Sequence, residues 1–254
     1  MINENLTIQN PTKELKESGM TLTNAIAQHY KQASDIDSGK ALSIAKSVVA
    51  TITNNSYLCD CAKKNTGSII DCINQAISLG LTIDANQYCW LIPYNTKVDG
   101  VWTKKIQLQV GFKGYIYKIN KSFPNTKIQA CLVKEKDVVE IKKVENNDIV
   151  NHTYSDPFSK ESKNIIGAYC IITFADGKSI VETINRADID LIKSKSKTKE
   201  DGVWEEWEGE MVKKSVIKRA CKVHFPAEVS SLEEYDNKQY DIIPKTKSLE
   251  DMNK

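Results

Sequence analysis

The stretch KIQLQVGFKGY, residues 105–115, decides the fold class of this chain. Its first half alternates, so that Ile106, Leu108 and Val110 fall on one face of a strand while lysine and glutamine side chains fall on the other. Its second half opens a segment, residues 111–122, in which apolar side chains recur at helical spacing. A half-buried strand that leads directly into a helix is therefore expected here.

Further strands lie on both sides of this stretch. Residues 88–94 form a strand pattern that a polar segment containing Asp99-Gly100 joins to 105–110, which predicts a β-hairpin. Three more strands are expected, at residues 128–134, 166–174 and 179–184, and Asp176-Gly177 joins the last two.

Helical spacing of apolar residues accounts for most of the remaining chain. Helices are expected at residues 21–33, 38–54, 69–79, 185–193 and 209–224. Ser68 and Asp71 have the spacing of a capping box at the start of the third helix, and Gly80 ends it. The sequence thus predicts an α+β fold, an antiparallel sheet with a β-hairpin, backed by helices.

The charge distribution divides the chain into three parts. The net charge is only +2, but residues 226–254 hold seven acidic residues against four lysines. We expect a flexible N-terminal arm at residues 1–20, a core at 21–226, and a flexible acidic tail at 227–254. The negative balance of the tail favours a partner protein over DNA as its ligand.

Several classes of protein are disfavoured by what the sequence lacks. No apolar run approaches the roughly 20 residues that cross a bilayer, and no signal-peptide pattern opens the chain, which predicts a soluble cytoplasmic protein without membrane contact. The seven cysteines are scattered without paired metal-ligand spacing, and the three histidines have no nucleophile beside them. We therefore predict no metal, no cofactor and no catalytic residue. The enzyme alternative is a metal-dependent nuclease that uses Asp137 and Glu140.

The polar face of the 105–110 strand is the first feature that indicates a nucleic-acid ligand. It carries Lys105, Gln107 and Gln109, and Lys113 follows between two glycines that would let a backbone approach closely. Exposed bases stack on aromatic side chains and phosphates attract cations, so a non-acidic polar face of this kind suits single-stranded DNA. The alternative is an ordinary solvated strand face.

The helix over residues 211–224 is the second such feature. At 100° per residue its apolar arc contains Val212, Val216, Ala220 and Val223. The opposite side carries a row of lysines, Lys214, Lys218 and Lys222, with Arg219 beside it and Lys213 at the edge of the apolar arc. Like charges at this spacing repel, and a polyanion would relieve the repulsion, although a solvated helix face is again the alternative.

A flexible basic run and the choice of cation complete the evidence for nucleic acid. Residues 193–199 alternate lysine with serine or threonine, so Lys195 and Lys197 could contact phosphates, or simply belong to a surface loop. Only Arg186 and Arg219 are arginines among 35 cations. Because lysine contacts phosphate as a point charge, this composition favours backbone binding without base readout.

Four blocks of the sequence are similar, in order, to blocks of a known family. They are residues 78–84 with 88–94, residues 107–114, the strand from Gly167 through Phe174, and Trp207 with 211–219. On these blocks the chain resembles the RecT family of phage and prophage single-strand annealing recombinases. Phe112 stands where that family often has tyrosine, and Ser215 where it often has threonine; neither changes the charge pattern.

The resemblance implies a function and a set of partners. It implies ATP-independent annealing of complementary strands, with single-stranded DNA and the nascent duplex as ligands, and no cofactor. It also implies a homo-oligomer (a ring or helical filament), a partner 5′–3′ exonuclease and a host single-strand binding protein. A core like that of other annealing proteins would have the hairpin and sheet line a basic groove. The groove candidates are then Lys105, Gln107, Gln109, Lys113, Tyr115, Lys213, Lys214, Lys218 and Arg219. A passive single-strand binding protein is the non-annealing alternative.

Overall fold

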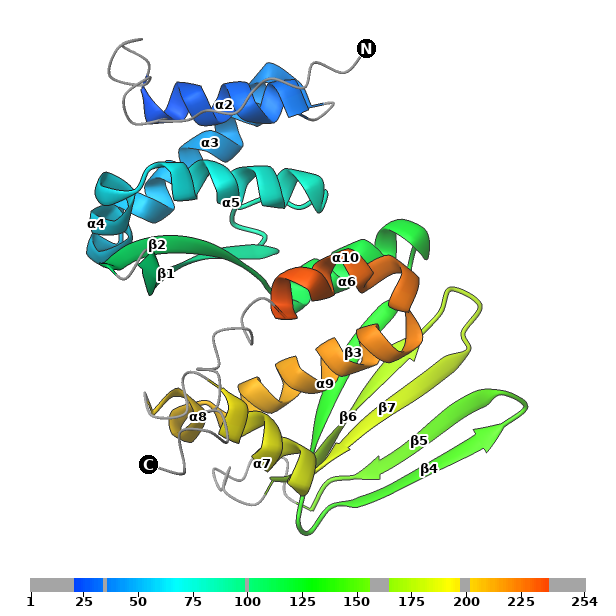
Figure 1. Cartoon of the computed structure of the whole chain (residues 1–254). Helices are drawn as coiled ribbons and strands as arrows, with labels where there is room; N and C mark the ends of the chain where they lie inside the picture. Colours follow the sequence, from blue (N-terminus) through cyan, green and yellow to red (C-terminus); the bar gives the residue numbers. More distant parts are fainter. Residues whose placement is uncertain (1–20, 34–35, 99–100, 156–164, 197–201, 238–254) are drawn as a thin grey trace, which may run out of the picture. The chain divides into compact units, whose positions relative to one another are not determined.

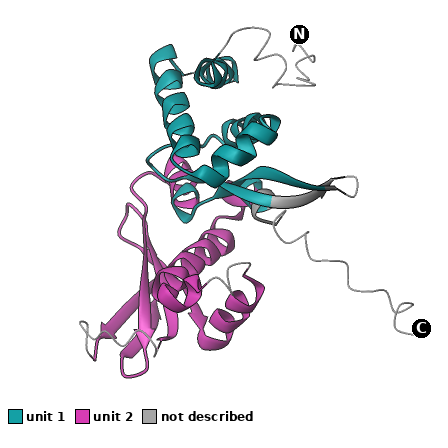
Figure 2. Ribbon diagram, turned by 90° about the vertical axis from the view of Figure 1, so that its left-hand side faces the viewer, with its two compact units in different colours: residues 1–114, 231–254 teal, residues 115–230 magenta. Residues whose placement is uncertain are grey.

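The computed structural model describes residues 21–33, 36–98, 101–155, 165–196 and 202–237 (Figure 1). The chain divides into two compact units, which are described one by one: residues 1–114 with 231–254, and residues 115–230 (Figure 2). Helices and small antiparallel sheets make up the described residues, so the α+β prediction is confirmed at that level. Among these helices, none has the length and apolar character to cross a membrane.

The first unit consists of helices packed on one side of a long hairpin. The helices are α2 (Leu22–Ala33), α3 (Ser38–Thr53), α4 (Ser56–Lys64) and α5 (Gly67–Ser78), and the hairpin is β1 (Cys89–Val98) with β2 (Val101–Val110). Ile26 of α2, Val48 of α3 and Ile73 of α5 are fully buried among the helices. Helices α4 and α5 both pack on β2, so the alternating apolar face of that strand closes the core of this unit.

The sequence predicted the C-terminal end of α5 correctly but not its N-terminal end. The helix begins at Gly67, and the predicted capping box is wrong because Ser68 lies inside the helix and is buried. Its hydroxyl accepts the backbone N–H of Ile106 at 3.2 Å, which ties α5 to β2. At the other end Gly80, with φ of 65°, ends the helix as predicted, since its left-handed conformation suits glycine.

The second unit is a three-stranded antiparallel sheet crossed by one long helix. The strands are β3 (Lys127–Lys134), β6 (Ile165–Thr173) and β7 (Ser179–Asn185), in the order β3-β6-β7. Helix α9 (Glu208–His224) lies across one face of this sheet and contacts all three strands (Figure 1). The smaller helices are α7 (Arg186–Lys195) and α8 (Val203–Glu206), and α6 (Phe112–Ser122) leads into β3.

A second hairpin in this unit was not predicted. It is formed by β4 (Val138–Val144) and β5 (Asn147–Thr153) and lies beside β7. The side chains of Asn147 and Asp148 accept the backbone N–H groups of Ser179 and Val181, at 2.6 and 2.9 Å. These contacts cap N–H groups of β7 that would otherwise stay unpaired at the sheet edge.

A buried polar network fixes the other end of this hairpin. His152 lies between Asp137 and Tyr169, with Nε2 at 3.2 Å from Asp137 Oδ2 and Nδ1 at 2.9 Å from the Tyr169 hydroxyl. A carboxylate only accepts, so Nε2 donates to Asp137, and in the neutral ring Nδ1 accepts from Tyr169. Burial raises the pKa of Asp137, but hydrogen bonds from Ser155, Lys134 and His152 outweigh it and lower the pKa to about 2. The network thus stabilises the ionised carboxylate.

Replacing Asp137 by asparagine should therefore loosen the β4–β5 hairpin. Asparagine presents one oxygen where the carboxylate presents two, so the cost should be about 1–3 kcal/mol of stability. Because the pKa of Asp137 is lower in the folded state, its contribution is complete above a pH of about 4 and is lost as the pH falls toward 2. Amide hydrogen exchange across residues 138–153 measures the effect. Glu140→Gln, at an exposed carboxylate paired with Lys142, is the matched control. Equal exchange in the two variants would show that the Asp137 network does not hold the hairpin.

The predicted boundary of the acidic tail falls inside a helix. Residues Pro226–Asn237 form α10, in which Val229 and Leu232 are buried. Apolar residues at this spacing bury one side of a helix, so helical structure continues past residue 227, where the flexible tail was expected to begin. The arm at residues 1–20 and the tail from residue 238 lie outside the described residues.

Candidate nucleic-acid interface

The β1–β2 hairpin has one face buried and one face available to a ligand. Ile106, Leu108 and Val110 are buried, whereas Lys105, Gln107 and Gln109 alternate with them and are half-buried. The alternation predicted for this strand is thus confirmed. The three polar candidates therefore share one face of the hairpin, turned away from the buried apolar side chains.

Strand β1 adds aromatic side chains to this polar face that the sequence analysis missed. The register pairs Trp90 with Gln109 and Tyr94 with Lys105, and directly paired residues project to the same side of a hairpin. The indole of Trp90 is 45% exposed. Burial raises the pKa of Tyr94, which is half-buried. We call Trp90, Tyr94, Lys105, Gln107 and Gln109 the hairpin face.

The sequence around the hairpin face is depleted in negative charge. Between Asp84 and Glu135 the chain has eight lysines, and Asp99 is its single acidic residue. Rings that can stack on bases, amides that can hydrogen-bond and a surplus of cations are the components of surfaces that bind single-stranded nucleic acids.

The two glycines that follow β2 serve packing rather than the approach of a ligand. A Cβ atom on Gly114 would lie 2.7 Å from the backbone oxygen of Tyr88, and one on Gly111 would lie 2.8 Å from that of Gln87. The backbone segment that packs closely against these glycines is therefore residues 87–88, just before β1. Lys113 is exposed between the glycines and donates to the side chain of Gln87 at 2.8 Å.

In the second unit, α9 carries the predicted row of lysines. Lys214, Lys218 and Lys222 are half-buried, one turn apart on a continuous helix. The ammonium groups of Lys218 and Lys222 lie 5.2 and 5.9 Å from the ring centroid of Tyr115. Tyr115 is fully buried, so its ring holds the lysines by cation–π attraction instead of offering a surface to a base. We call the three lysines the lysine row.

The apolar arc of α9 is displaced from the predicted one. Val212, Val216 and Ala220 are buried as expected, and Ile217 and Cys221 are buried with them, but Val223 is 54% exposed. The buried arc therefore includes Ile217 and Cys221 in place of Val223, on a helix that packs on all three strands of the sheet. Lys213 lies one turn before Ile217 and is part-buried, and its ammonium reaches outward to Glu210 at 3.0 Å.

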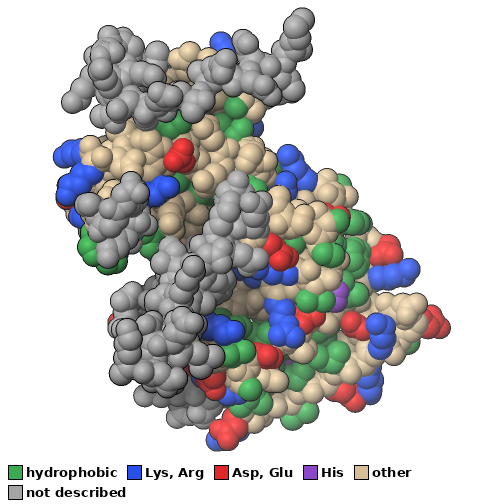
Figure 3. All heavy atoms as spheres, in the orientation of Figure 1, with side chains coloured by type: hydrophobic (Ala, Val, Ile, Leu, Met, Phe, Trp, Pro, Cys, Tyr) green, Lys and Arg blue, Asp and Glu red, His purple; other side chains and the backbone are tan. Residues whose placement is uncertain are grey.

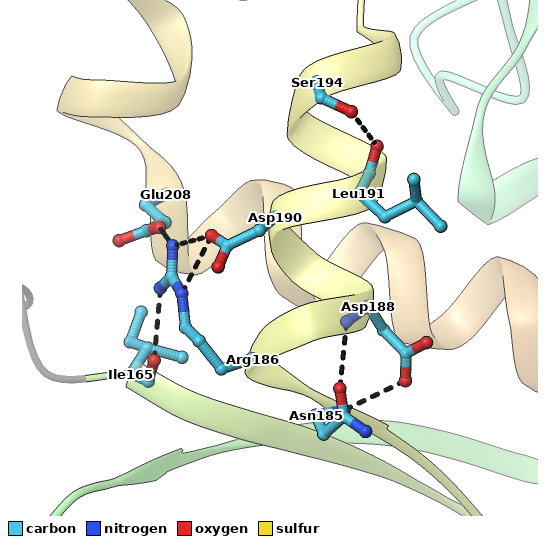
Figure 4. A network of polar contacts seen from close by, with 8 residues as sticks. All are labelled: Ile165, Asn185, Arg186, Asp188, Asp190, Leu191, Ser194 and Glu208. Atoms are coloured by element: carbon cyan, nitrogen blue, oxygen red, sulfur yellow. Dashed lines mark hydrogen bonds and ion pairs between the residues drawn. The ribbon is translucent and has the colours of Figure 1, made fainter.

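The two arginines hold the second unit together. Arg219 Nε donates to Glu182 on β7 at 2.8 Å, and a second nitrogen lies 3.6 Å from Asp188 on α7. Figure 4 shows Arg186 bonded to Asp190, to Glu208 and to the carbonyl of Ile165. On the face drawn in Figure 3, lysines and arginines likewise lie among acidic side chains. Arg219, a predicted DNA contact, therefore has carboxylates as partners.

The remaining candidates fall outside these two surfaces. Lys195 is exposed at the last residue of α7, and Lys197 lies outside the described residues. The nuclease candidates meet different partners, since Asp137 is buried against His152 while Glu140 is exposed and pairs with Lys142. Within the described ranges, no cluster of three or more histidine, cysteine or acidic side chains could hold a metal ion.

Comparison with known proteins identifies the family. Residues 43–250, which include all of the second unit and part of the first, match the RecT family. A stretch of 160 residues, 62% of this chain, is 28% identical to Protein RecT of Escherichia coli (strain K12) and spans 58% of the length of that protein. The family match extends over most of the sequence and both candidate surfaces, so this chain belongs to the RecT family.

Proposed function

We propose that this protein binds single-stranded DNA along its backbone and anneals complementary strands in homologous recombination, without ATP and without cutting DNA. Membership of the RecT family supports this role. The observation that carries the proposal is the hairpin face, where Trp90 and Tyr94 lie across from Gln109 and Lys105. This face combines stacking surfaces with a cation and has no acidic side chain among its members.

The chemistry of the two surfaces fits binding without base readout. Lysine supplies all the cations of the hairpin face and the lysine row, and an ammonium group contacts phosphate without the paired geometry that reads guanine. Aromatic rings stack on any base. A strand held in this way keeps its base edges available, so that a second strand can pair with it by Watson–Crick geometry.

Annealing requires no covalent step from the protein. Base pairing supplies the free energy, and the cations lower the electrostatic repulsion between two strands that each carry one charge per phosphate. The protein then acts as a holder of the nascent duplex, and no cofactor or metal is needed. A homo-oligomer, either a ring or a filament, would bind a longer stretch of DNA than one subunit. A 5′–3′ exonuclease and a host single-strand binding protein would be its partners.

Binding and DNA integrity can be measured together. We expect the purified chain to bind two unrelated single-stranded oligonucleotides with similar affinity in fluorescence anisotropy, with a steep decrease in affinity as salt rises. End-labelled DNA incubated with the protein and magnesium should keep its full length on a denaturing gel. Magnesium-dependent shortening would favour the nuclease alternative. Binding confined to one of the two sequences would contradict backbone recognition.

A further inference from the structure

The end of the β1–β2 hairpin carries a hollow that is separate from the hairpin face. It has a volume of about 760 Å³ and is lined by Lys64 at the end of α4 and by Trp102, Thr103 and Lys104 of β2. Volumes of this size are typical of sites that hold a small molecule or a single residue of a polymer. Trp102 and Lys104 alternate with the polar residues of the hairpin face, so they project to the opposite side of the strand.

Trp102 lies on the core side of the hairpin without being part of the core. Trp102 is 70% exposed, whereas Ile106, four residues further along β2 and on the same side of the strand, is buried. Most of the Trp102 side chain therefore lies outside the packed core of this unit. A large flat ring kept in water beside a hollow is a common feature of binding surfaces.

The charges around the hollow are mainly positive. The ammonium of Lys104 lies 4.2 Å from the ring centroid of Tyr57 on α4, a cation–π contact that fixes its position. Burial raises the pKa of the Cys61 thiol on α4, and the positive charges of Lys104 and Lys64 act against this shift while Asp60 adds to it. Two lysines thus flank the indole, with one carboxylate nearby on α4.

We propose that this hollow is a stacking site for one unpaired base of single-stranded DNA. The base lies on the indole of Trp102, and the neighbouring phosphates meet Lys64 and Lys104. This proposal rests on the proposed function. It extends that function because it adds a second contact for the strand, on the side of β2 opposite the hairpin face. A base in a duplex has both faces covered by its neighbours, so the hollow selects single strands over duplex DNA.

Photocrosslinking tests this assignment directly. A thymine oligonucleotide with 5-iodouracil at scattered positions is bound to the full chain and irradiated with long-wavelength ultraviolet light, and the crosslinked peptides are identified by mass spectrometry. We expect a crosslink at Trp102 that disappears in Trp102→Ala and is absent when the oligonucleotide is first annealed to its complement. Trp102→Ala should also weaken single-strand binding by at least about fivefold, whereas Trp102→Phe keeps most of the affinity.

Trp207 provides a matched control. Its indole is 60% exposed, but it is flanked in sequence by Glu206 and Glu208, so Trp207→Ala should leave both the crosslink and the affinity unchanged. If the wild-type chain binds the oligonucleotide and crosslinks elsewhere but not at Trp102, the stacking site is wrong while the proposed function stands. If the wild-type chain does not bind single strands at all, the proposed function itself fails. Should Trp102→Ala misfold, the wild-type crosslink map still decides.

Discussion

Replacing Lys214 and Lys218 by glutamine is expected to flatten the salt dependence of single-strand binding by about 1.4 in the slope of log affinity against log salt. Each phosphate neutralised on a single strand contributes about 0.7 to that slope, and the two side chains lie one turn apart on α9. The loss of affinity relative to the wild type should then be about 25-fold larger at 0.1 M salt than at 1 M salt. The loss should be equal for unrelated sequences because a lysine on phosphate reads no base.

Folding should change little in this double variant. Glutamine has nearly the helix propensity of lysine, so the main loss is the cation–π contact between the half-buried Lys218 and the buried Tyr115 ring, worth about 0.5–2 kcal/mol. Lys142→Gln with Lys143→Gln on β4 is the matched control, since it removes two exposed charges from the same unit. A titration by fluorescence anisotropy gives both slopes. If the α9 variant keeps the wild-type slope, the lysine row is a solvated helix face.

Replacing Gly114 by valine should strongly destabilise the first unit. The new Cβ would lie 2.7 Å from the backbone oxygen of Tyr88 and 3.0 Å from Val110 Cγ1. The Tyr88 oxygen already accepts the N–H of Gly111 at 2.8 Å, so it cannot move away without breaking that bond. Overpacking against fixed backbone costs about 2–3 kcal/mol, and single-strand binding should weaken with the distorted hairpin.

Chemical denaturation followed by circular dichroism measures this cost. Ser122→Val places the same β-branched residue at the exposed end of the same helix, where the structure leaves room for it. Valine has a higher helix propensity than glycine, so a loss of stability in Gly114→Val alone would come from the steric clash. If the Gly114→Val protein has the same stability and binding as the Ser122→Val protein, a side chain at position 114 fits beside the Tyr88 oxygen and the predicted clash is wrong.

The features predicted correctly are those that depend on local sequence. The period of two through Ile106, Leu108 and Val110 fixed the buried face of β2, and the period of 3.6 in α9 located the lysine row. Gly80 ended α5 because a left-handed residue there favours glycine in any fold.

The features that were missed depend on contacts between distant segments. The β4–β5 hairpin has no clean alternation, and its packing depends on His152 meeting Tyr169 and on Asn147 capping β7. Trp90 joined the hairpin face only through its register with Gln109, which lies at the far end of the paired strand. The bond between Arg219 and Glu182 was missed because the two residues are 37 positions apart, a distance that the spacing within α9 does not reveal.

Strand annealing in the absence of ATP and magnesium shows whether this protein is an annealing protein or only binds single strands. Two complementary oligonucleotides carrying a donor and an acceptor fluorophore are mixed with the protein, and energy transfer reports duplex formation over time. We expect the chain to accelerate annealing well beyond the spontaneous rate without ATP or magnesium. The Lys214→Gln and Lys218→Gln double variant should lose much of this acceleration. A chain that binds both strands yet leaves annealing at the spontaneous rate, or slows it, would be a passive single-strand binding protein, and the proposed annealing function would be wrong.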